Sequence, residues 1–139
     1  LRILRYLRFF LNYSQKDHSE SSKKIIRKNI EGISKISSER LLDELRKIFL
    51  SKNFLKLGKD KFSVEILQLI FPQLKNLNIV NNLNEVQKSI IQKKDFLFIV
   101  SLMIIDDTDN SDYFIYKFKL SNEQTKRIKF PSWQNRRMI

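Results

Sequence analysis

The chain has 139 residues, of which 27 are Lys or Arg and 15 are Asp or Glu, giving a formal net charge of +12. Its length allows one domain or part of one, and the absence of cysteine excludes both a disulfide scaffold and cysteine-ligated metal sites. The longest apolar run, residues 96–105, is about half as long as a bilayer span requires, so no membrane helix is predicted.

Apolar residues at three- and four-residue spacing, with two glycines and two prolines in all, predict an all-α chain with short polar turns. The first predicted helix runs from Leu1 to about Asn12. A polar stretch, Ser14–Ser22, is predicted as a loop. A second helix follows it and ends near Gly32, which we interpret as a C-cap.

The third predicted helix has the clearest start signal. Ser37 can cap it, Glu39 lies in its positive first turn, and apolar residues at helical spacing continue to Phe49. After a polar break, the apolar run Phe62–Phe71 predicts another helix, which Pro72 stops.

The second half of the chain continues the helical pattern. Residues 84–94 and 95–105 predict two helices, and the latter is apolar nearly all round, as expected for a helix buried in a bundle. A loop is predicted over residues 106–112.

The segment 113–120 is ambiguous in isolation, because its side chains could alternate as a strand. Ser121 and Gln124 form a capping box that opens a final helix toward Ile128. We therefore favour helix on both sides of that box.

The positive charge favours a polyanion such as RNA, DNA or an anionic membrane. Residues 1–60 carry 15 basic and 7 acidic side chains, whereas residues 95–112 carry five acids and no base, so the basic surface is expected in patches. Because 18 of the 27 cations are Lys in a sequence crowded with Ile and Asn, the lysines also fit a compositional bias.

The sequence offers little for catalysis. His18, the only histidine, lies in a polar stretch and is interpreted as a solvated loop residue rather than a catalyst. Asp107 and Asp109 could hold Mg²⁺ if a strand carried them, but the pattern favours a solvated loop. Gly32 and Gly58 are isolated, which excludes a glycine-rich phosphate loop.

Three arginines at three-residue spacing, Arg2, Arg5 and Arg8, are the most selective feature. On a helix they form a slanting stripe beside the apolar face, and guanidinium groups placed in this way can contact several oxygens of one nucleotide. An amphipathic helix with basic flanks, and no nucleotide, fits the same spacing.

Three segments together resemble a known family. Leu1–Phe9 looks like the R-x-L-R-x-x-R-F helix of class II tRNA nucleotidyltransferases, the family of CCA-adding enzymes and bacterial poly(A) polymerases. Ser37–Leu45 looks like the S-x-E-R-I-x-x-E-L segment of that family, and Ile70–Leu74 resembles its L-x-P-E-L helix end. The order and spacing agree over residues 1–76, and the resemblance is weak from residue 77 onward.

The resemblance implies a helical neck in residues 1–76 and the start of a helical body in 77–139. In that family the neck selects incoming ATP or CTP by side chains, and the body grips the tRNA or another RNA 3′ end. The alignment places Arg2 at the selecting arginine and Arg5 and Arg8 at positions that contact the nucleotide. The residues it assigns to a neck segment that stabilises the site are Ser37, Glu39, Arg40 and Glu44.

The catalytic head domain of the family, with its Mg²⁺-binding aspartates, has no counterpart here. The chain is therefore expected to be inactive alone and to need a head in cis or on a separate chain, and both of its ends are interpreted as cut. The resemblance also implies a bacterial, cytoplasmic protein, and it leaves CCA addition and polyadenylation equally open. Two other hypotheses remain: a stand-alone helical RNA-binding or adaptor module, and a non-functional remnant of a split gene.

Overall fold

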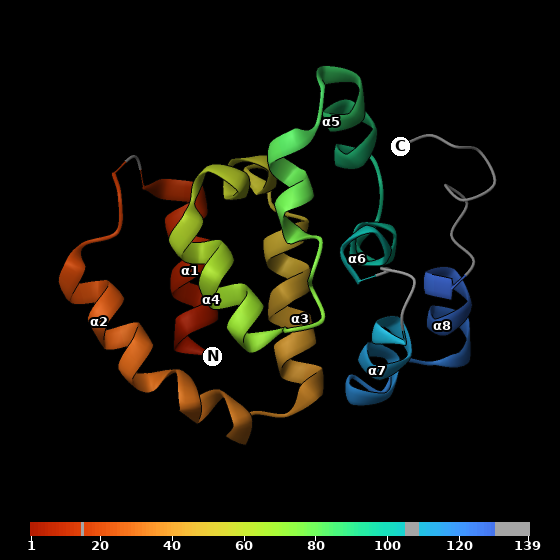
Figure 1. The fold of residues 1–139 in the computed structure, drawn as a ribbon, viewed down its shortest axis with the longest axis horizontal. Coiled ribbons are helices and arrows are strands. Elements are labelled where there is room, and N and C mark those ends of the chain that lie inside the picture. Colours follow the sequence, from red (N-terminus) through yellow and green to blue (C-terminus); the bar gives the residue numbers. More distant parts are fainter. Residues whose placement is uncertain (15, 105–108, 130–139) are drawn as a thin grey trace.

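The computed structural model describes residues 1–14, 16–104 and 109–129, and every regular element in these ranges is a helix (Figure 1). The all-α prediction is therefore confirmed for this part of the chain. The α-helices are α1 (Arg2–Tyr13), α2 (Glu20–Asn29), α3 (Ser38–Phe49), α4 (Lys61–Ile70), α5 (Glu85–Gln92), α6 (Phe96–Ile104), α7 (Asn110–Lys117) and α8 (Asn122–Lys129). The 3₁₀ helices are η1 (Ile30–Lys35), η2 (Phe54–Lys59) and η3 (Leu77–Asn82).

Helices α1 and α3 lie side by side and run in the same direction (Figure 1). Arg5 bonds to Glu44 and Asn12 accepts a hydrogen bond from Ser51, so the residues in contact keep one offset along both helices. Their facing stripes are buried because both helices are amphipathic. Helix α2 and η1 connect the end of α1 to the start of α3, and α2 lies on the side of α1 away from α3 (Figure 1).

Helix α6 lies at the centre of the second half of the chain. All of its side chains except Leu97 are buried, as the apolar pattern predicts. Its last carbonyl groups accept hydrogen bonds from residues outside the helix. The backbone N–H of Asn76 donates to the Met103 carbonyl at 2.9 Å, and the side-chain amide of Asn110 donates to the Ile104 carbonyl at 2.7 Å. Helix α8 packs against α6 through Ile128, which is fully buried.

The buried side chains form one continuous cluster that crosses residue 76. Phe71 contacts Phe118 with ring centroids 5.5 Å apart, and Phe49 contacts Phe96 at 5.9 Å. The division of the chain at residue 76 stays a prediction. Within the described residues, no helix combines the length and the apolar character that crossing a membrane requires.

The predicted helix starts are confirmed where they depend on local capping. Ser37 accepts a hydrogen bond from the backbone N–H of Arg40 at 3.3 Å, at the start of α3. The capping box of Ser121 and Gln124 is present, with reciprocal bonds of 3.1 and 2.9 Å. The preference for helix over strand after residue 112 is also confirmed by α7.

Three boundaries were wrong. Gly32 is not a C-cap: it lies inside η1, and no glycine has positive φ. The polar stretch Ser14–Ser22 is not loop throughout, because Ser19 caps α2 and the helix begins at Glu20. Residues 110–112 are the first turn of α7 rather than loop. The pair Asp106-Asp107 lies outside the described residues.

Candidate nucleotide and RNA interface

The three arginines lie along the outer side of α1, as their spacing predicts. The opposite side of this helix is buried through Leu4 and Leu7, which leaves Arg2 and Arg5 exposed and Arg8 at the edge of the packed face. The Arg5 side chain is 57 % exposed and that of Arg8 is 33 % exposed. Both side chains are therefore partly accessible to a ligand.

Glu44 of α3 lies beneath two of these arginines. Its side chain is only 4 % exposed, and its Oε1 accepts a hydrogen bond from Arg5 Nε at 3.3 Å. Its Oε2 accepts no hydrogen bond from the described residues and lies 3.9 Å from Arg8. The Nζ of Lys47 lies 3.6 Å from Oε1 of Glu44. A buried carboxylate needs cationic partners, so Glu44 is both stabilised by this cluster and able to hold Arg5 and Arg8 in place.

A shallow, open hollow extends along this side of α1. All of its lining residues come from α1: Arg2, Arg5, Tyr6, Arg8, Phe9, Asn12 and Tyr13. Arg2 also lines a second hollow of about 580 Å³ between α1 and α2–η1, where Ile25 and Ile33 make the wall apolar. The structure thus brings all three predicted arginines to one surface.

The other predicted motif residues lie on α3 in different settings. Ser37 is the N-cap, whereas Glu39 and Arg40 are exposed in the first turn. On the exposed side of the same helix, hydrogen bonds from Lys47 and Arg46 lower the pKa of Asp43. The structure brings Glu44 alone of the predicted motif residues into contact with Arg5 and Arg8.

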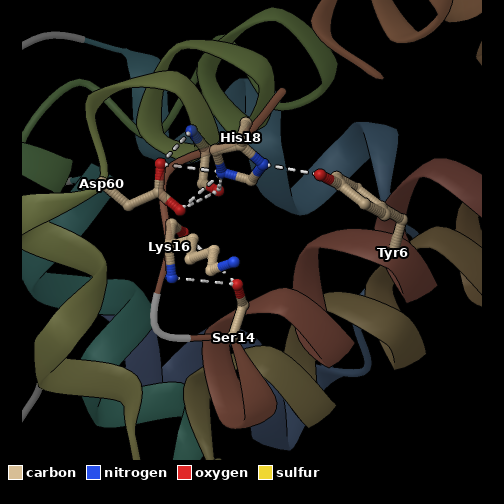
Figure 2. Close-up of polar contacts among 6 residues, drawn as sticks. Tyr6, Ser14, Lys16, His18 and Asp60 are labelled. Carbon is tan, nitrogen blue, oxygen red and sulfur yellow. Dashed lines mark hydrogen bonds and ion pairs between the residues drawn. The ribbon is translucent and has the colours of Figure 1, made fainter. Parts of the chain in front are cut away.

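His18 is not a solvated loop residue, and the prediction was wrong. It is 7 % exposed, and its ring stacks on Phe10 with centroids 3.5 Å apart. Its Nε2–H donates to the Asp60 carboxylate at 2.8 Å, and its Nδ1 lies 2.7 Å from the Tyr6 hydroxyl (Figure 2). Burial raises the pKa of Tyr6 and the nearby Asp60 charge acts the same way, against a lowering effect of Ser22.

The His18 cluster lacks the geometry of a catalytic triad. In such a triad the acid and the nucleophile bond to different imidazole nitrogens. Here Asp60 and the Ser63 hydroxyl share Nε2, at 2.8 and 3.2 Å, and Ser63 donates its own proton to Asp60 at 2.6 Å. The cluster therefore fixes the segment after α1 against the start of α4. Sequence reasoning missed it because Asp60 is 42 residues away from His18.

Residues 19–77 match a family model described as "Probable RNA and SrmB- binding site of polymerase A". This segment belongs to the poly(A) polymerase family. The resemblance predicted from the sequence is thereby confirmed for residues 19–77, which form the RNA-binding domain. Comparison with curated proteins and with solved structures gave no significant match.

The RNA-binding domain extends from α2 to the start of η3 and includes the motif residues of α3. It carries 13 Lys or Arg and 7 Asp or Glu, an excess of six positive charges. Arg2, Arg5 and Arg8 precede the matched segment, yet Glu44 within the domain contacts two of them. The RNA-binding domain and the arginine side of α1 are thus one packed unit.

The Mg²⁺ expected in a complete enzyme of this family has no matching ligand set in the described residues. No group of three or more His, Cys, Asp or Glu side chains in this part of the chain is arranged to hold a metal ion. We assign no metal ligand to it.

Proposed function

We propose that this chain is the RNA- and nucleotide-binding helical part of an enzyme that adds nucleotides to RNA 3′ ends in the bacterial cytoplasm. The match of residues 19–77 to the RNA-binding domain of polymerase A carries the proposal. The catalytic head, with its Mg²⁺, belongs to the same polypeptide or to a separate chain. The chain described here binds substrates and does not polymerise by itself.

We propose further that the arginine side of α1 binds the incoming ATP or CTP. Arg2 reads the edge of the base, and Arg5 and Arg8 hold phosphate or ribose oxygens. A guanidinium group has five donors, so Arg5 keeps donors for a ligand while its Nε bonds to Glu44. The ion pairs with Glu44 support the proposal, because they reduce the freedom that two long side chains lose on binding.

RNA binding is tested by titrating the chain with a single-stranded RNA at several salt concentrations. Each neutralised phosphate contributes about 0.7 to the slope of log affinity against log salt. Replacing both Arg5 and Arg8 by Ala should leave this slope nearly unchanged, because both are proposed to hold the incoming nucleotide and not the RNA backbone. Arg127→Ala, an exposed arginine on α8, is the charge-matched control for one substitution. A flat salt titration of the wild type would contradict an RNA-binding role.

Nucleotide selection is tested with Arg2→Ala. A bidentate contact to a base contributes about 1–3 kcal/mol of discrimination. This variant should therefore reduce the difference between ATP and CTP affinity while leaving RNA affinity nearly unchanged. Binding is measured by calorimetry on the chain and selectivity by incorporation assays on a complete enzyme. RNA affinity without any ATP or CTP binding would instead assign a stand-alone RNA-binding module. Affinity for neither would assign a non-functional remnant.

A further inference from the structure

Two aromatic side chains project from the outer side of α1 into solvent. Phe9 is 64 % exposed and Tyr13 is 73 % exposed, and their ring centroids are 4.9 Å apart with the planes tilted by 42°. They are one helical turn apart and face away from Leu7, which is buried. This pair contributes little to the core, so its aromatic faces are available to a ligand.

The chemistry around the pair selects the class of that ligand. Phe9 and Tyr13 line the same hollow as the three arginines, and this hollow has no aliphatic and no acidic side chain in its lining. Aromatic and arginine side chains are also enriched at protein interfaces, but the core of such an interface is depleted of charge, whereas three cations line this hollow. Aromatic faces interleaved with cations instead match single-stranded nucleic acid, whose bases stack and whose phosphates need positive charge.

The spacing of the two rings restricts how a base can bind. A base inserted between them would need two van der Waals contacts of about 3.5 Å each, or roughly 7 Å in all. The centroid separation of 4.9 Å excludes insertion, so a base must stack on the outward faces of the pair. Along α1, Arg5 and Arg8 lie between Arg2 and the pair, so a base stacked on the pair would lie beside the nucleotide that these arginines are proposed to hold.

We propose that Phe9 and Tyr13 form a stacking platform for an unpaired base of RNA. This inference rests on the proposed RNA-binding function and adds the residues that receive the base. The platform lies beside the arginines proposed to hold the incoming nucleotide, so it would place the RNA end next to that nucleotide. Duplex RNA, whose bases are already stacked, gains nothing from it.

The test compares a single-stranded oligoadenylate with a fully paired RNA duplex of equal length. The double variant Phe9→Leu with Tyr13→Leu keeps apolar bulk and removes both aromatic faces. It should bind the single strand at least about fivefold more weakly and the duplex unchanged. Phe9→Trp, which enlarges the aromatic face, should retain or improve single-strand binding. Tyr116→Ala removes a more exposed tyrosine on α7 and is the matched control.

Each remaining outcome has a separate meaning. If the wild type binds the single strand and the double variant binds it equally well, the platform is wrong while the RNA-binding function stands. If the wild type binds neither RNA, the proposed function fails and the platform fails with it. If the double variant loses the same affinity for the single strand and the duplex, the substitutions act generally on α1 and the stacking proposal is wrong. Unchanged RNA affinity with lost association to a head domain assigns a protein interface and also overturns it.

Discussion

The imidazole Nε2 of His18 lies 2.8 and 3.0 Å from the two carboxylate oxygens of Asp60. This contact joins the segment between α1 and α2 to the first turn of α4, where Asp60 is also the N-cap. The helix that carries the arginines is therefore fixed to the RNA-binding domain at its far end, while Glu44 holds it near its start. Two polar contacts from different helices thus determine how the arginine side of α1 is presented.

His18→Ala should lower the free energy of unfolding by about 2–4 kcal/mol, because it leaves a cavity beside Phe10 and removes the partner of Asp60. Asp60→Asn keeps an acceptor for the helix cap and removes the charge. The double variant should cost less than the sum of the two single variants, by about 0.5–3 kcal/mol. Denaturant unfolding measures all three.

Asp17→Asn is the control for this cycle, because it removes an exposed charge next to His18 in the sequence. It should change stability by less than about 0.5 kcal/mol. Strict additivity of His18→Ala and Asp60→Asn would show that the two side chains do not stabilise each other.

Tyr6 should make stability depend on pH in the alkaline range. Its pKa is raised from the ordinary value of 10.0 by burial and by Asp60, so folding favours the neutral phenol. The contribution of Tyr6 to the free energy of unfolding is therefore complete below pH 10 and is lost as the pH rises through the folded pKa. The stability advantage of wild type over Tyr6→Phe should shrink there.

The same substitution isolates the titration directly. The chain has four tyrosines, and the part of the tyrosinate absorbance that disappears in Tyr6→Phe reports this residue alone. That part should appear above pH 10 in the folded protein. A Tyr6 component that titrates below pH 10 would contradict the burial of the phenol against His18.

Features encoded within a few residues could be predicted from the sequence. Ser37 and Ser121 bond to groups three residues away, so capping patterns located the starts of α3 and α8. The spacing of the apolar residues in α1 was enough to predict which side of the helix carries the arginines. The all-apolar pattern of 96–104 likewise indicated a buried helix, which α6 is.

Features that depend on distant partners could not be predicted in this way. His18 sits among polar neighbours, and nothing local indicates that Asp60 and Tyr6 enclose it. The contact between Glu44 and Arg5 spans 39 residues, and the resemblance assigned Glu44 only a general stabilising role. The 3₁₀ segments were missed as well, because their weak hydrogen-bond pattern has no strong period in the sequence.

Glu44→Gln should separate nucleotide binding from RNA binding. It keeps the shape of the side chain and removes the charge that holds Arg5 and Arg8. We expect ATP or CTP affinity to fall by about fivefold, or about 1 kcal/mol, because the guanidinium groups lose their fixed positions. RNA affinity should stay equal or increase, because the surface gains one net positive charge.

Glu65→Gln is the matched control for Glu44→Gln. It makes the same change of charge on α4, where Glu65 is half exposed and pairs with Arg27. This variant should share the small gain in RNA affinity and leave ATP and CTP affinity unchanged. A parallel loss of nucleotide and RNA affinity in Glu44→Gln alone would mean that Glu44 supports the fold rather than the arginines.

Alanine at the two glycines should act in opposite directions. A Cβ at Gly58 would lie 2.5 Å from the side-chain oxygen of Asn81 and 3.2 Å from its backbone nitrogen, where η2 meets η3. Gly58→Ala should therefore lower the free energy of unfolding by about 1–3 kcal/mol through overpacking. A Cβ at Gly32 meets no atom within 4 Å, and φ there is not positive. Gly32→Ala should therefore stabilise by about 0.4–1 kcal/mol by restricting the unfolded chain.

Asn81→Ala tests the proposed cause of the Gly58 effect. It removes the oxygen at 2.5 Å but not the backbone nitrogen, so Gly58→Ala should cost less in this background than in the wild type without becoming neutral. Thermal and denaturant unfolding of the four combinations gives the coupling energy. If Gly58→Ala cost the same in both backgrounds, the Asn81 side chain would not be what makes glycine necessary where η2 and η3 meet.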